Sequence, residues 1–403
     1  MNAPSKGRVL AAFRIRSFRF QWSADLLTSW AFEMETLILG WYVLVATDSV
    51  FLLTVFGALQ FGGTLLSPYI GMLADRISRR RLLIALRIAY ASCAWVLTAL
   101  EVSGLLVPWH VFAIALVAGL LRPSDLVLRN ALIADTVPQA QLPNAMGLSR
   151  MTMDSARIVG TLAGAGLFST IGFGAAYVVV TVFYVMSVGL TQGVAPGSAR
   201  RAGGAWAELQ LGLRYVLQTP AIAGLMCFAF LVNLTAFPFS HGMLPYVAKD
   251  IYGTDANGLA HLMAAYAVGA LLGSLALAWS GRTAQATRIV IGGIYAWYLL
   301  LLLFAVTESK VVGLAVLAAI GLVQSLSMIS MSVALLMMTS IEFRGRVMGL
   351  RMLAVYGLPL GLLAGGALVE RIGFTPQALL YALVGLALTT LITLRWRDVL
   401  WRA

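Results

Sequence analysis

Residues 71–81 read Gly71-Met72-Leu73-Ala74-Asp75-Arg76-Ile77-Ser78-Arg79-Arg80-Arg81, a polar segment within a largely apolar chain. Apolar segments flank it, from about residue 51 to 70 and from about residue 82 to 100. Each has the roughly 20 apolar residues that a helix needs to cross a bilayer. Because one aspartate and four arginines are costly to place in hydrocarbon, the stretch predicts a tight loop between two spanning helices, at one membrane face.

The composition extends this prediction to the whole chain. Of the 403 residues, 60% are hydrophobic and 11% are charged, whereas soluble domains carry about 25% charged residues. We therefore expect an all-α polytopic membrane protein with twelve transmembrane helices. We place the spans at residues 20–46, 51–70, 82–101, 109–130, 144–168, 174–193, 218–240, 258–280, 289–306, 311–338, 346–369 and 376–394.

The distribution of basic residues predicts the topology. A net charge of +12 suggests nucleic-acid binding in a soluble chain. With twelve spans, however, both termini lie on one side, together with nearly every arginine. Only Lys249, Lys310 and Arg371 fall on the other side. Since positive residues stay in the cytoplasm, we expect both termini to be cytoplasmic, in a bacterial cytoplasmic (inner) membrane, and we expect no nucleic-acid partner.

The two halves of the chain repeat. The segment Leu162-Ala163-Gly164-Ala165-Gly166 with its continuation to Ile171-Gly172-Phe173 matches Leu363-Ala364-Gly365-Gly366-Ala367 with its continuation to Ile372-Gly373-Phe374. Upstream, Met146-Gly147-Leu148 matches Met348-Gly349-Leu350. This places span 5 over span 11 and predicts two pseudo-symmetric six-helix bundles. The expected domains are a basic arm (1–19), an N-terminal bundle (20–193), a cytoplasmic linker (194–217), a C-terminal bundle (218–394) and a tail (395–403).

Charges inside the predicted spans gather in the first half. A charge at the bilayer centre costs at least about 2.5–3.5 kcal/mol, so such residues are by default functional hypotheses. Spans 7 to 12 have none deep in the membrane, and Arg351 lies close to the inner end of span 11. Spans 1, 4 and 5 carry Asp25, Glu33, Glu35, Arg122, Asp125, Arg150, Asp154 and Arg157.

Helix spacing predicts partners for some of these acids. Asp154 lies between Arg150 and Arg157 on one helical face, at four and three residues. Asp125 similarly has Arg122 three residues before it and Arg129 four residues after it. A static ion-pair network that fastens spans 1, 4 and 5 is the alternative to a coupling role, and for Asp154 with Arg150 and Arg157 it is the favoured explanation.

Glu33 and Glu35 differ because span 1 offers them no basic neighbour. Two residues are about 200° of rotation around a helix, so the two side chains cannot face one cavity. At least one must be protonated or take a partner from span 4 or 5, and Arg122 is the candidate nearest in depth. We therefore expect Glu33 and Glu35 to carry protons. Asp25 lies nearer the inner face, where we expect it to reach water.

The loop pattern Gly-x-Leu-Ala-Asp-Arg-x-x-Arg-Arg resembles the loop 2–3 signature of the major facilitator superfamily of transporters, with Ser78 in place of the usual second glycine. This resemblance implies a gating loop of Gly71, Asp75, Arg76, Arg79 and Arg80. In it, Asp75 latches against the start of span 11, while the arginines contact Asp75 and lipids.

Further motifs resemble one branch of that superfamily. The Arg-x-x-Gly at Arg157 and the Gly-Arg-Val-Met-Gly-Leu around Arg346 are similar to the branch that holds the enterobactin exporter and macrolide efflux proteins. The glycine run from Gly160 to Gly166 is similar to the span 5 signature of proton-driven exporters, with Thr161 where proline is usual. Small residues at this spacing also let helices approach closely.

The expected function is proton-coupled efflux of a small amphipathic or siderophore-like molecule by alternating access. Uptake, or flipping of a lipid-like substrate, is the alternative, and a membrane sensor that transports nothing ranks last. Three lysines and no glycine-rich phosphate loop argue against ATP hydrolysis. We expect no enzymatic activity, cofactor or metal. We expect the partners to be the substrate, protons and membrane lipids, and the protein to be a monomer.

Overall fold

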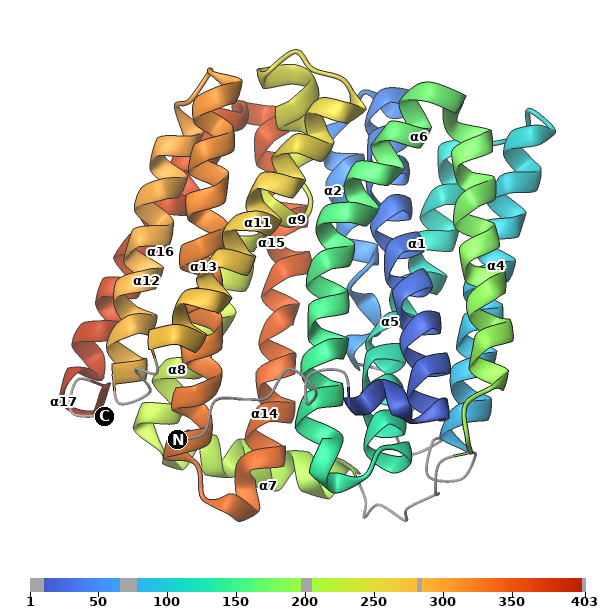
Figure 1. Ribbon diagram of the computed structural model, residues 1–403. Coiled ribbons are helices and arrows are strands. Elements are labelled where there is room, and N and C mark those ends of the chain that lie inside the picture. Colours follow the sequence, from blue (N-terminus) through green and yellow to red (C-terminus); the bar gives the residue numbers. More distant parts are fainter. Residues whose placement is uncertain (1–10, 66–77, 197–204, 281–284, 401–403) are drawn as a thin grey trace. The chain divides into compact units, whose positions relative to one another are not determined.

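A computed structural model describes residues 11–65, 78–196, 205–280 and 285–400 (Figure 1). Within these ranges the secondary structure is helical, without strands. The contacts divide the chain into two units. Unit 1 is Met1–Tyr42 with Leu65–Ala202, and unit 2 is Val43–Thr64 with Gly203–Ala403. Residues 43–64 thus group with the C-terminal part of the chain, whereas the bundle boundaries drawn from the sequence stay a prediction.

Unit 1 contains three long helices and most of a fourth, α1, whose last residues belong to unit 2. Each helix is a long apolar run, and charged residues interrupt these runs at only a few positions. The helices and the two short 3₁₀ turns of unit 1 are η1 (Ala11–Arg14), α1 (Arg16–Thr47), α4 (Arg79–Val102), α5 (Pro108–Thr136), η3 (Gln139–Gln141) and α6 (Leu142–Gln192).

The described part of unit 2 contains six helices of 16 or more residues and several short ones. α7 and α8 meet at 109°, so α7 leaves the direction of α8. α7 packs against α14, and its Tyr215 ring stacks on Phe343, the last residue of η6, with the ring centroids 4.3 Å apart. The helices are α2 (Val50–Leu59), η2 (Gly62–Leu65, at the unit boundary), α7 (Ala205–Gln218), α8 (Pro220–Thr235), α9 (Phe237–His241), α10 (Leu244–Tyr246), the π-helical turn η4 (Val247–Ile251), α11 (Ala256–Ser280), α12 (Ala286–Ala305), α13 (Lys310–Met338), η6 (Ile341–Phe343), α14 (Arg344–Leu353), η7 (Ala354–Tyr356), α15 (Gly357–Ile372), α16 (Phe374–Arg395) and α17 (Arg397–Leu400).

The spanning helices agree with the predicted architecture. In the described ranges, eight helices are long and apolar enough to cross a membrane, or nine if the bent pair α7–α8 counts as one span. One of the eight is α6, which covers two predicted spans. α1 is 32 residues long, but its acids lower its mean hydropathy. In the span predicted over 51–70, α2 ends at Leu59 and the 3₁₀ helix η2 follows over Gly62–Leu65; residues 66–77 lie outside the described ranges.

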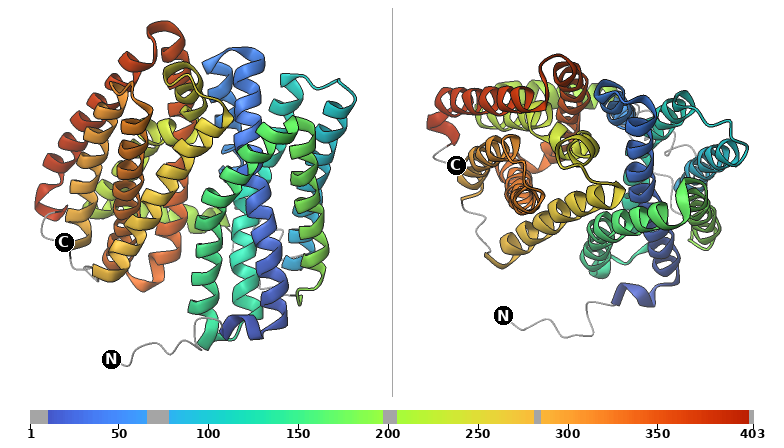
Figure 2. Two further views of the ribbon diagram at one scale, coloured as in Figure 1. Left: turned by 45° about the horizontal axis from the view of Figure 1, so that its top comes forward. Right: turned by 90° about the horizontal axis from the view of Figure 1, so that it is seen from above.

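The repeat between the halves is visible as two equivalent turns. α6 runs in one direction and then returns (Figures 1 and 2), and the reversal is at Gly172, with φ 79° and ψ 175°. Gly373, between α15 and α16, has nearly the same backbone, with φ 84° and ψ 167°. Glycine adopts positive φ without the steric cost that a Cβ brings. The matched Ile-Gly-Phe triplets therefore make the same turn in both halves.

Glycines on the matched helices also pack in the same way. A Cβ on Gly164 of α6 would lie 2.9 Å from Met34 Cα of α1. In unit 2, Gly361 of α15 lies against the Leu234 carbonyl of α8. The glycine run thus confirms the prediction of close helix approach. Span 5 packs on span 1 in the first half, and span 11 packs on span 7 in the second.

Candidate functional site

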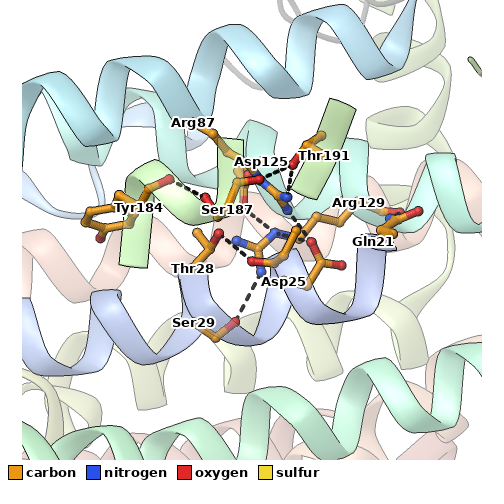
Figure 3. Close-up of polar contacts among 11 residues, drawn as sticks. Gln21, Asp25, Thr28, Ser29, Arg87, Asp125, Arg129, Tyr184, Ser187 and Thr191 are labelled. Atoms are coloured by element: carbon orange, nitrogen blue, oxygen red, sulfur yellow. Dashed lines mark hydrogen bonds and ion pairs between the residues drawn. The ribbon is translucent and has the colours of Figure 1, made fainter. Parts of the chain in front are cut away.

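Buried charges form a lower layer in unit 1, where α1, α4 and α5 meet (Figure 3). Asp25 of α1 forms an ion pair with Arg87 of α4 and lies 3.5 Å from Arg129 Nε of α5. Arg129 Nε is also 2.5 Å from Asp125 Oδ2, one turn earlier on α5. Two acids and two arginines therefore balance each other's charge within one network.

Polar side chains hold this lower layer in place. Arg87 donates to Thr191 Oγ1 near the end of α6. Gln21 Nε2 donates to the Arg129 carbonyl at 2.8 Å, and Arg129 Nη1 donates to Ser29 Oγ at 3.2 Å (Figure 3). The layer ties four helices together, which is the arrangement expected of a frame that keeps one geometry.

Two predictions about this layer have different outcomes. Asp125 takes its partner from its own helix, at Arg129, as the spacing predicts. The expectation that Asp25 reaches water is wrong, because the residue is only 4% exposed. The physical reason is Arg87, which is fully buried and neutralises Asp25. The sequence had placed Arg87 among the arginines of the inner face.

Glu33 belongs to a second group of charges, the upper layer, which also contains Glu35, Arg122 and Arg157. Glu33 lies eight residues after Asp25 on α1, or about 12 Å at a rise of roughly 1.5 Å per residue. Its Oε1 lies 3.9 Å from Arg157 Nε of α6, and the two side chains are 16% and 44% exposed. Glu33 therefore takes its partner from span 5, one of the two alternatives the sequence left open. The ion pair is with Arg157, and Arg122, the candidate expected from its depth, stands near Glu33 as well. The pair is looser and more exposed than the ion pairs of the lower layer.

Glu35 points to the other side of α1, as a separation of about 200° requires. Tyr177 and Tyr184 each donate a phenolic hydrogen bond to it, at 2.7 Å to Oε1 and 2.7 Å to Oε2. The two tyrosines are seven residues apart on the returning run of α6, so they share one helical face. Sequence reasoning missed them, although this spacing opposite an intramembrane acid was the available signal.

Arg122 stands near both glutamates. Its guanidinium lies over the Phe32 ring, a cation–π contact from α5 to α1, and its charge interacts with Glu33 and with Glu35. The upper layer thus contains two acids and two arginines, as the lower layer does. Its acids, however, are held by a loose ion pair and by neutral hydroxyls.

The glycine face of α6 brings Arg157 to Glu33. Arg157, Gly160 and Gly164 are three and four residues apart and therefore lie on one face. A Cβ on Gly160 would lie 3.2 Å from Glu33 Cβ and 3.2 Å from the Trp30 carbonyl. The Arg-x-x-Gly motif combines a charge with the small residue that lets α1 come close enough to meet it. The matched position in the second half is Leu358.

The other predicted site residues lie apart from the two layers. Asp154 pairs with Arg150 at 3.2 Å, which confirms one of its two expected partners, while Arg157 turns to Glu33. Arg79 pairs with Asp135 at 2.9 Å, and Arg80 donates to the Val194 carbonyl at 2.9 Å. The remaining gating-loop residues, Gly71, Asp75 and Arg76, lie outside the described residues.

Comparison with known families and proteins points to a membrane transport protein. A family model described as transmembrane secretion effector matches residues 8–402. The chain is similar to macrolide efflux protein A of Streptococcus pyogenes, with 22% identity over 295 residues that cover 68% of this chain and 71% of that protein.

Solved structures show the same fold at low sequence identity. The nucleoside transporter NupG superposes with a TM-score of 0.72 at 15% identity and covers 93% of this chain and 98% of its own. The human organic anion transporter MFSD10 gives 0.63 at 16% identity, over 94% and 99%. A bacterial homologue of the human lysosomal transporter Spinster, in an inward-facing and unoccupied conformation, gives 0.67 at 14% identity, over 93% and 96%.

Proposed function

Because the chain belongs to the transmembrane secretion effector family of major facilitator transporters, we propose that it exports a small amphipathic or siderophore-like molecule in exchange for protons. The proposal rests on the arrangement of the upper layer. Two glutamates at membrane depth on opposite sides of α1 each take their partner from α6. The name of the relative from Streptococcus pyogenes makes a macrolide the first substrate to test.

The surroundings of Glu35 suit both of its protonation states. An ionised carboxylate accepts one hydrogen bond from each tyrosine, as the 2.7 Å distances describe. A phenol can also accept a hydrogen bond. A protonated Glu35 can therefore donate to one tyrosine and accept from the other, so both of its carboxyl oxygens keep a hydrogen-bond partner. A group that must gain and lose a proton in each transport cycle needs such surroundings.

Glu33 suits a second role, as a switch between α1 and α6. Two unit charges about 4 Å apart attract by about 4 kcal/mol at an effective dielectric of 20, before desolvation is subtracted. Protonation of Glu33 removes that attraction and releases the partly exposed Arg157. Even a fraction of this energy shifts a two-state equilibrium between inward-open and outward-open forms. Arg122 then stabilises whichever glutamate is ionised.

The remaining predicted residues take supporting roles in this proposal. Asp25 and Asp125 belong to the tightly paired lower layer, which keeps α1, α4 and α5 in register. Asp154, paired with Arg150, stiffens α6 near Arg157. By resemblance, Gly71, Asp75, Arg76, Arg79 and Arg80 form the inner latch.

We place the protein in a bacterial cytoplasmic membrane as a monomer, with both termini in the cytoplasm, on the basis of the arginine distribution. The same architecture also serves uptake or the flipping of lipid-like substrates. These alternatives differ from export in the direction of the proton gradient that drives accumulation, so one reconstituted assay separates them.

The test is gradient-driven accumulation of a radiolabelled macrolide, or of a panel of amphipathic dyes, in proteoliposomes with an imposed pH gradient. Wild-type protein should accumulate substrate on the side where protons are more concentrated. Glu33→Gln and Glu35→Gln should abolish accumulation, while Glu342→Gln, which removes an exposed carboxylate within η6, should not. Accumulation that persists in both variants would remove the two glutamates from the mechanism.

A further inference from the structure

The two residues that join α1 to α2 are held from two sides within unit 2. Asp48 and Ser49 connect Thr47, the last residue of α1, to Val50, the first of α2. Asp48 has a left-handed backbone with φ 48°, a conformation that costs most residues energy but that aspartate tolerates better than most. Such a backbone persists where surrounding contacts fix it.

The first contact is an ion pair with Lys249. Its Nζ lies 2.5 Å from Asp48 Oδ1, although 201 residues separate them in sequence. Lys249 belongs to the π-helical turn η4, a rare geometry that is frequent at functional sites. Both residues fall on the membrane face predicted to be outer.

The second contact comes from Glu370, near the end of α15. Its Oε1 accepts a hydrogen bond from Ser49 Oγ at 2.5 Å and from the Phe51 backbone N–H at 3.1 Å. A carboxylate is stabilised at a helix N-terminus, where backbone N–H groups lack partners. Glu370 therefore caps α2 with a side chain from a helix more than 300 residues away in sequence.

Below this cap α2 and α15 pack with almost no space between them. Gly366 of α15 lies against the Thr54 side chain of α2, and a Cβ on Gly57 would lie 3.3 Å from Leu362. Thr54 is fully buried. A bulkier residue at Gly366 would collide with Thr54, so the contact between the two helices depends on these small side chains. We call this contact between α2 and α15, at Thr54 and Gly366, the seam. A reagent can reach it from the outer face only when α2 and α15 separate.

The connection Asp48–Ser49 directly follows α1, the helix that contains Glu33 and Glu35. Asp48, the first residue after α1, follows Glu35 by thirteen residues, or about 20 Å at 1.5 Å per residue. A helix of this length transmits a shift along its axis. A movement of α1 at the two glutamates therefore reaches the contacts of Asp48 and Ser49.

We propose that Asp48, Ser49, Lys249 and Glu370 form an outer clamp that holds the outer ends of α1 and α2 against η4 and α15, and that must release before the seam opens outward. The clamp acts on the conformational equilibrium of the transporter, and its role rests on alternating access but not on proton coupling. Neither Lys249 nor Glu370 belongs to the candidate coupling layers.

The first test measures access to the seam. Thr54→Cys is placed in a background with Cys93→Ser and Cys227→Ser, and cells are treated from outside with a membrane-impermeant thiol reagent. Glu370→Ala and Lys249→Met should each raise the labelling rate at least about fivefold, and the double variant should raise it further. Glu308→Ala, a control at the exposed turn between α12 and α13, should leave the rate unchanged.

Unchanged labelling in the clamp variants would overturn the proposal. If Glu370→Ala fails to reach the membrane, Lys249→Met and the milder Glu370→Gln carry the same test. Labelling requires neither substrate nor a proton gradient, so it separates a failure of the clamp from a failure of proton-coupled export.

A second test closes the clamp covalently. Cysteines replace Asp48 and Lys249 and are joined by a cleavable bifunctional thiol reagent. Transport should stop after cross-linking and return after cleavage, whereas each single cysteine should transport under the same treatment. Transport that continues through the cross-linked form would show that these residues need not separate.

Discussion

Removing Arg87 from the lower layer should destabilise unit 1 strongly. Arg87→Met keeps an unbranched apolar stem but removes the guanidinium, and it leaves Asp25 buried with Arg129 as its remaining ionic partner. Loss of one partner from a buried ion pair costs about 3–5 kcal/mol, since the other charge stays buried. Because Arg129 still compensates part of the Asp25 charge, we expect a cost near the lower end of this range, about 3 kcal/mol.

The measurement is thermal unfolding of the purified protein in detergent, followed by tryptophan fluorescence. For a unit of roughly 150–250 residues, about 3 kcal/mol corresponds to a Tm lower by roughly 6–12 °C. Arg150→Met removes an arginine whose side chain is 65% exposed, and a change of less than about 1 kcal/mol is expected there.

A double variant tests the reasoning behind this magnitude. Asp25→Asn combined with Arg87→Met removes both charges, so the buried charge that causes the penalty is gone. The double variant should recover most of the lost Tm, because replacing a buried pair by neutral groups is often close to neutral in stability. A double variant as unstable as Arg87→Met alone, or a single variant with unchanged Tm, would refute the account of the lower layer.

Three further predictions concern the upper layer and the clamp. Replacing Tyr177 and Tyr184 by phenylalanine removes hydrogen bonds to a charged group worth about 1.5–3 kcal/mol each, so the Tm should fall, and gradient-driven accumulation by the folded variant in proteoliposomes should drop about tenfold or more. Gly164→Ala places a Cβ 2.9 Å from the α1 backbone and should cost about 1–3 kcal/mol in thermal unfolding, whereas Gly166→Ala, with no heavy atom within 4 Å, should be tolerated. The Lys249 hydrogen bond lowers the pKa of Asp48 below its ordinary 3.8, and the Asp48 hydrogen bond raises the pKa of Lys249 above 10.5. The pair is therefore fully charged from pH 5 to 8 and is lost only as the pH falls through the lowered Asp48 pKa or rises through the raised Lys249 pKa. Because thiol labelling itself accelerates with pH as more thiolate forms, the ratio of the Thr54→Cys labelling rate with Lys249→Met to the rate with the intact clamp is the quantity that should stay constant across that window.

The sequence predicted the architecture because membrane-length apolar runs and the arginine distribution are local properties of the chain. The repeat was also visible, because the glycines of spans 5 and 11 are fixed by a turn and by a close helix contact that both halves need. The pairing of Asp125 with Arg129 and of Asp154 with Arg150 followed from helix periodicity alone.

The contacts between helices were predictable only in part. Arg87 follows the arginine run of the gating loop closely, so its charge suggested the inner face, and only the packing of α1, α4 and α6 shows that it is buried. Arg122 and Arg157 were both available to Glu33 by depth. The choice of Arg157 depends on the rotation of α6, which the glycine face sets. Tyr177 and Tyr184 have no charge that marks them in the sequence.

The central claim is that protonation of Glu33 and Glu35 couples substrate movement to proton movement, and the most direct measurement is proton flux driven by a substrate gradient. Proteoliposomes with a trapped pH-sensitive dye and no imposed pH gradient receive substrate on one side. Wild-type protein should move protons in the direction opposite to the substrate, and Glu33→Gln and Glu35→Gln should pass substrate downhill with no change in internal pH. Proton flux of wild-type size in both variants would contradict the account.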